Sequence, residues 1–228
     1  LRGEKVRLIE MAVSNAESLL AAQAEEEKID LARDMMAVLN LKKPPRRIEG
    51  MDISTLQGGH AVGAVVSFVD GEAHRAGYRN YRIREIEGVD DYGMMAEMVR
   101  RRLERGMLPD LFLVDGGKGH LNRVKALVDR YGDGEARGAQ TSSLKAIEVI
   151  SIAKPVESRG ETTDKVYLPG RKNPVNLSGG HPVLLFLMRI RDEAHRRAVE
   201  YHHRLRRKSL HASELDRIPG VGPERKKR

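Results

Sequence analysis

The spacing of apolar positions separates a helical N-terminal segment from a following region that alternates strands and helices. Residues 4–40 are rich in Ala, Glu, Leu, Met and Lys and contain no proline. Their apolar positions follow a helical period, which predicts one or two amphipathic helices that act as a linker or a packing arm. Pro44 and Pro45 end this segment because neither can continue a helix.

After the prolines the apolar pattern becomes typical of strands. Three predicted strands, with Asp70-Gly71 as a tight turn, form an antiparallel meander over residues 48–54, 60–69 and 75–84. Further strands are predicted over 111–114 and 147–153, helices over 90–105, 118–131 and 182–206, a loop over 132–143, and a short hairpin around 166–168. This order is typical of an α/β, RNase H-like fold, a mixed five-stranded sheet flanked by helices. In that layout the first and fourth strands are neighbours.

Composition adds a preference for a polyanionic partner. The net charge is +8, and such an excess of Lys and Arg favours phosphates, although a merely basic protein remains the alternative. Aromatic residues make up only 4% of the chain, so we expect it to bind the nucleic-acid backbone rather than to stack on bases. The absence of Cys excludes disulfides and thiolate zinc sites and is consistent with a cytoplasmic protein. No apolar run approaches the ~20 residues that cross a bilayer.

Two aspartates occupy strand positions where apolar residues are expected. Asp52 lies between Met51 and Ile53, and a buried carboxylate is costly unless it is paired or binds a metal. Asp115 ends the fourth strand, and the glycines that follow it allow a backbone or a phosphate to approach closely. Alone, Asp115 is better explained as a cap for the next helix. On neighbouring strands, however, the two aspartates would face one another and share a divalent cation.

The last predicted helix supplies a third candidate. Its stripe at helical spacing runs through Leu184, Met188, Arg191, His195, Ala198 and His202. Arg191 and His195 therefore face the sheet that carries the aspartates. A single histidine is more often an ordinary core or surface residue, but beside two aspartates a catalytic site is the better interpretation. Three histidines at 195, 202 and 203 also suggest zinc, but the chain has no HExxH motif.

Other motifs indicate contact with phosphates. The Gly-Gly-Lys-Gly string at 116–119 resembles a phosphate cradle but lacks nucleotide-binding P-loop spacing, so nucleotide hydrolysis is a weaker alternative. Basic residues at 196–197 and 204–208 either bind DNA or form a solvated helix face. In the string at 215–223, Gly220 and Gly222 let backbone N–H groups approach a phosphate, unless the string is an ordinary turn.

Together, four strings resemble the C-terminal half of UvrC, the incision subunit of the bacterial excinuclease. They are Ile-Glu-Gly-Met-Asp-Ile-Ser at 48–54, Leu-Val-Asp-Gly-Gly-Lys-Gly at 113–119, Arg-Asp-Glu-Ala-His-Arg at 191–196 and Ile-Pro-Gly-Val-Gly-Pro at 218–223. The last is similar to the first hairpin of the family's helix–hairpin–helix domain. The resemblance covers nearly the whole chain, although Met51 stands where an aromatic residue is common in the family.

This resemblance implies a domain organisation. We expect a helical arm or linker over 1–43, an RNase H-like endonuclease domain over 44–208, and a linker with a truncated helix–hairpin–helix motif over 209–228. Nothing resembles the family's N-terminal GIY-YIG nuclease or the segment that holds UvrB. The chain also begins with Leu1 rather than Met and ends within a motif, so we expect a piece of a longer protein.

The resemblance also implies an activity, the incision 5′ to a lesion in damaged duplex DNA, with UvrB and UvrA as partners. Its catalytic triad falls on Asp52, Asp115 and His195. We expect the two aspartates to hold Mg²⁺ or Mn²⁺, and the histidine to take a proton from the attacking water or to complete the metal shell. Lys118, Lys154 and Arg191 are candidates to neutralise phosphate charge. An inactive DNA-binding scaffold and another RNase H-like nuclease, such as a junction resolvase, remain the alternatives.

Overall fold

The computed structural model describes residues 2–55, 61–86, 90–135 and 146–216. The predicted hairpin glycines Gly220 and Gly222 lie outside these residues, as does most of the loop predicted over 132–143. Within the described ranges, none of the helices combines the length and the apolar character needed to span a membrane.

The centre of the molecule is a mixed sheet whose order is β3-β2-β1-β5-β6-β7, with β4 also paired to β2. The strands are β1 (Arg47–Ser54), β2 (Val62–Val69), β3 (Glu72–Ala73), β4 (Arg79–Arg82), β5 (Leu111–Asp115), β6 (Glu148–Ala153) and β7 (Lys165–Tyr167). β1 pairs antiparallel with β2 and parallel with β5, and β5 pairs parallel with β6. The predicted RNase H-like layout, with the first and fourth strands as neighbours, is therefore confirmed.

The predicted number of five strands is wrong, because the sheet has seven strands among the described residues. The third predicted strand begins as a short 3₁₀ helix, η1 (Arg75–Gly77), in which the Tyr78 N–H donates to the Arg75 carbonyl at 3.1 Å. In this segment, β3 before the 3₁₀ helix and β4 after it are the parts that pair with β2. The predicted hairpin around Val166 adds the seventh strand, since β7 pairs with β6 and Val166 also accepts a hydrogen bond from the Val175 N–H.

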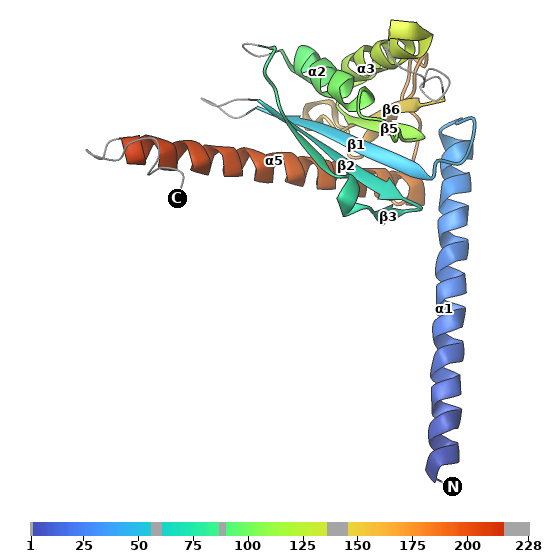
Figure 1. Ribbon diagram of the computed structural model, residues 1–228. Coiled ribbons are helices and arrows are strands. Elements are labelled where there is room, and N and C mark those ends of the chain that lie inside the picture. The colour runs from blue at the N-terminus through green and yellow to red at the C-terminus, as the bar shows by residue number, and fades with distance from the viewer. Residues whose placement is uncertain (1, 56–60, 87–89, 136–145, 217–228) are drawn as a thin grey trace.

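Helices cover both faces of the sheet (Figure 1). α2 (Asp91–Leu103) and α3 (Lys118–Arg130) pack together on one face, and α5 (Pro182–Asp216) crosses the other along β1 and β2. Each face has its own core. Ile48, Val66, Leu113, Ile150 and Leu187 represent the core beneath α5. Met51, Met98, Val114, Val124 and Val149 represent the core beneath α2 and α3.

The N-terminal segment is one helix, α1 (Arg2–Val38), which projects away from the sheet (Figure 1). Its last turn joins the domain, because Met35 and, just after the helix, Leu39 and Leu41 are buried in the core beneath α5. Apolar side chains farther from the domain are exposed, including Ile9 and Leu19. The boundary predicted at residue 43 stays a prediction, although the core includes residues on its N-terminal side.

α5 continues to Asp216, ten residues beyond its predicted end at 206. The sequence explains this length, since no glycine or proline occurs between Pro182 and Pro219. Three short irregular elements complete the described chain. They are η1, the single π turn η2 (Tyr131–Glu135) and the 3₁₀ helix η3 (Glu157–Arg159).

Candidate active site

Strand pairing brings the two predicted aspartates together. Side chains alternate between the faces of a strand, so Ile48, Gly50 and Asp52 of β1 all face α5. On β5, Leu111, Leu113 and Asp115 share that face by the same alternation. Met51 is in register with Val114, which places Asp52 beside Asp115 at the carboxyl ends of two parallel strands.

Gly116 turns the chain sharply after Asp115. Its φ is +138°, a conformation that L side chains rarely adopt, and its N–H donates to the Ile152 carbonyl at 2.9 Å. A Cβ at this position would lie 2.5 Å from Nδ1 of His120. Glycine is therefore required to hold the end of β5, and with it Asp115, against β6 while α3 begins.

α5 brings the third predicted residue to the same place. His195 Nδ1 lies 2.9 Å from Asp52 Oδ2, and one ligand atom from each of Asp52, Asp115 and His195 lies within 4.8 Å of the others. The His195 side chain is 52% exposed and that of Asp52 only 9%, so the cluster opens to solvent on the histidine side. The structure thus groups all three predicted triad residues.

The electrostatics of the cluster favour a cation. Burial, together with the neighbouring charge of Asp52, raises the pKa of Asp115 to about 6. Burial also raises the pKa of Asp52, against the opposing effect of its hydrogen bond to His195. Two carboxylates that resist ionising together are stabilised by a divalent cation, which prefers such hard oxygen ligands. The donor set therefore fits a divalent cation.

Arg191 lies beneath the cluster rather than at its surface. The residue is 6% exposed, and its guanidinium forms ion pairs at 2.7 Å with Asp164 and with Asp192. Its positive charge lowers the pKa of Asp115 and so opposes the effect of burial. The predicted contact of Arg191 with phosphate stays a prediction. Asp164 was not foreseen, because it follows η3 in a segment without strand or helix periodicity.

The two predicted lysines are placed differently. Lys154 directly follows β6, is exposed, and lies near enough to both aspartates for its charge to lower their pKa values. Lys118, in the first turn of α3, donates to the carbonyl of Lys172. Lys154 is therefore the better placed of the two to meet a phosphate at the carboxylates.

The glycines of the 116–119 string also have a packing role that the sequence did not reveal. The rings of Tyr92 and His120 lie 4.6 Å apart at the first turns of α2 and α3. A Cβ at Gly119 would lie 2.6 Å from the Tyr92 hydroxyl, just as one at Gly116 would meet His120. The predicted phosphate cradle stays a prediction, and close packing of the two helix ends already accounts for these two glycines.

Comparison with known proteins is consistent with this geometry. Residues 36–199 match the family model described as the UvrC RNAse H endonuclease domain. The chain is 44% identical over 99% of its length to UvrABC system protein C of Desulfotalea psychrophila, of which it covers 36%. It is also 44% identical over 99% of its length to UvrABC system protein C of Geotalea daltonii, and it covers 37% of that protein. The chain thus spans little more than a third of these relatives.

Among solved structures, endonuclease V of Ciona intestinalis bound to DNA is similar over 82% of this chain and 98% of its own. Its TM-score is 0.44 and its sequence identity 13%, so this likeness carries no functional argument.

Proposed function

We propose, from the premise that the chain belongs to the UvrC RNase H endonuclease domain family, that it is a metal-dependent DNA endonuclease module. Its reaction is the 5′ incision of bacterial nucleotide excision repair, on damaged duplex DNA in the cytoplasm. UvrB at the lesion, and UvrA earlier in the pathway, are its proposed partners. The observation that carries this proposal is the clustering of ligand atoms of Asp52, Asp115 and His195 within 4.8 Å of one another, at the carboxyl ends of β1 and β5.

Asp52 and Asp115 would hold the cation, Mg²⁺ or Mn²⁺. When bound, the ion polarises the phosphate and lowers the pKa of water. With a histidine in place of a third carboxylate, the cluster has only two acidic groups, which favours one cation over two. Lys154 approaches from β6 to offset the negative charge that develops on the phosphate.

Asp52 also orients His195. With the Nδ1 proton donated to Asp52 Oδ2, the other ring nitrogen, Nε2, has a free lone pair. Since the ring is half exposed, Nε2 can accept a proton from the attacking water. Asp52 would thus both bind the metal and fix the tautomer of His195, whereas Asp115 would only bind the metal.

The test is incision of lesion-containing duplex DNA by the intact protein with UvrA and UvrB. We expect Asp52→Asn and Asp115→Asn to abolish 5′ incision while binding to DNA stays near normal. We expect His195→Ala to slow it by ~10²–10⁴-fold, the usual contribution of a general base. The matched control is Asp129→Asn, which removes an exposed carboxylate from α3.

Retained cutting by either aspartate variant would refute the assignment. A wild-type protein that binds but never cuts would instead indicate an inactive scaffold. Preferential cutting of branched DNA without UvrB would indicate a resolvase.

A further inference from the structure

The charge pattern of α5 changes at Glu200. On the preceding turns, arginines are paired with acids on the same helix: Arg196 with Glu193 at 2.7 Å and with Glu200 at 2.5 Å. Arg197 lies 3.6 Å from Glu200. From residue 201 to residue 213 the sequence has no acidic residue. Arg204, Arg206 and Arg207 accordingly form no ion pair within the part of the chain that the structure describes.

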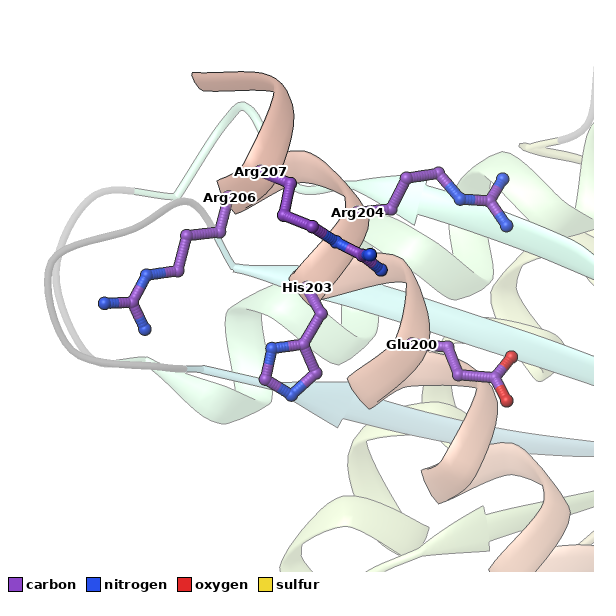
Figure 2. Close-up of a pocket in the computed structure, with 5 residues that line it drawn as sticks. All are labelled: Glu200, His203, Arg204, Arg206 and Arg207. Carbon is purple, nitrogen blue, oxygen red and sulfur yellow. The ribbon is translucent and has the colours of Figure 1, made fainter. Parts of the chain in front are cut away.

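These arginines line a hollow of about 600 Å³, together with Glu200 and His203 (Figure 2). His203 and the three arginines are all exposed, whereas His202, just before them, is 5% exposed and still faces the domain. Figure 2 shows Arg204 and Arg206 extending to opposite sides of the helix. This arrangement follows from helix geometry, because positions two residues apart are ~200° apart around the axis.

The same helix carries His195, so the distance from the catalytic cluster to the arginines is fixed. At ~1.5 Å per residue, Arg204 and Arg207 lie ~14 and ~18 Å along the axis from His195. In Figure 1 this part of α5 extends beyond the sheet. A DNA duplex that is held at the catalytic cluster and runs along α5 would therefore pass over the arginines.

We infer that residues 203–207 of α5 bind the phosphate backbone of duplex DNA four to five base pairs from the scissile phosphate. This inference rests on the proposed function. The spacing follows from ~14–18 Å of helix and ~3.4 Å per base pair. Arg204 and Arg206, which extend to opposite sides of the helix, would then meet phosphates on either side of α5.

Because it consists of arginines, this surface is suited to bind the DNA backbone rather than to recognise bases. Guanidinium groups bind phosphate oxygens through two parallel hydrogen bonds, and such contacts position a protein without reading sequence. The acid in the hollow, Glu200, is already paired with Arg196 and Arg197, so its repulsion of phosphate is reduced. The role inferred for this surface is to hold the duplex in position relative to the catalytic cluster.

The first test measures binding of the intact protein to lesion duplex DNA over a range of salt concentrations, with Ca²⁺ in place of the catalytic metal. In the triple variant Arg204→Gln/Arg206→Gln/Arg207→Gln, we expect the slope of log K against log salt to fall by about 2 to 3, since each lost phosphate contact removes about 0.9. A control variant, Lys5→Gln/Arg7→Gln/Arg33→Gln, removes the same charge from exposed positions on α1. An unchanged slope in the α5 variant, or an equal fall in the control, would overturn the inference.

The second test locates the contact with duplexes that carry one uncharged methylphosphonate at successive positions. We expect binding by the wild-type protein to weaken most with the substitution four to five base pairs from the expected position of the 5′ incision, and the triple variant to lose that sensitivity. Equal sensitivity of both proteins at every position would contradict the inference. Because neither measurement requires cutting, a protein that shows this footprint without incision would refute the catalytic proposal alone.

Discussion

Gly50 sets the distance between α5 and β1, the strand that carries Asp52. A Cβ at this position would lie 2.5 Å from Cγ2 of Ile190 and 3.3 Å from the Ile190 carbonyl oxygen. Carbon atoms in contact are normally ~3.5–4.0 Å apart, so Gly50→Ala must push α5 outward by about 1 Å. Because α5 also carries His195, the 2.9 Å contact between His195 Nδ1 and Asp52 Oδ2 would be stretched.

Two effects of different size should follow in Gly50→Ala. Overpacking a core costs ~1–3 kcal/mol, so the melting temperature should fall modestly. A displacement of ~1 Å at catalytic groups costs roughly 10²-fold in rate, so 5′ incision should fall far more than the folded population does. Incision of lesion DNA at saturating protein, beside thermal unfolding by circular dichroism, separates the two.

A second substitution tests whether the cause is steric. Ile190→Leu keeps the volume of the side chain but removes the Cγ2 branch that meets the new Cβ. Gly50→Ala/Ile190→Leu should therefore recover most of the lost incision. Gly180→Ala is the matched control, because a Cβ there meets nothing within 4 Å. Wild-type incision in Gly50→Ala, or no recovery in the double variant, would refute the reasoning.

Three further predictions concern the carboxylates and the two faces of the sheet. Since the pKa of Asp115 is raised to about 6, its proton stabilises the metal-free fold at low pH, and that contribution is lost as pH rises through 6. Asp115→Asn should therefore raise the melting temperature of the metal-free protein much more at pH 8 than at pH 4.5. Mn²⁺ should stabilise the wild type progressively from pH 5 to pH 7; equal effects at both pH values would contradict this. Gly116→Ala should lower the free energy of unfolding, measured in urea, by ~1–3 kcal/mol and abolish incision. The reason is that the alanine would be strained at a φ of +138° and would meet the His120 ring. Incision at the wild-type rate would show that the turn tolerates a side chain. Arg102→Met should lower the free energy of unfolding, measured in urea, by ~3–5 kcal/mol, because it leaves Glu49 buried without its ion pair at 2.6 Å. The folded variant should nevertheless retain its rate of incision, since the ion pair lies on the face of the sheet away from α5.

The element order and the candidate site were largely predictable from the sequence. Carboxylates at strand positions where apolar residues are expected identified Asp52 and Asp115, and the order of strands and helices predicted that their strands are neighbours. Helical spacing placed His195 on the face of its helix that meets the sheet. Each of these inferences depends on local periodicity and on a topology that many chains share, so a single sequence was enough to make them.

The sequence did not predict the ion pair between Arg191 and Asp164 or the division of the third strand. The segment that contains Asp164 has no period, so nothing local placed it beneath the site. Residues 75–84 were predicted as one strand, but residues 75–77 form a 3₁₀ turn whose Gly77 leaves no room for a Cβ beside Ser67. In both places, contacts with residues distant in sequence decided the conformation.

The sequence by itself therefore determined which residues form the candidate catalytic cluster, because alternation and helical spacing fix the face on which a side chain lies. Only the tertiary structure decided how close the three residues come and what surrounds them. Gly50 lets α5 approach β1, Gly116 holds the end of β5, and burial raises the pKa of Asp115. These properties depend on distances between separate elements, and a pattern along one chain fixes faces but not distances.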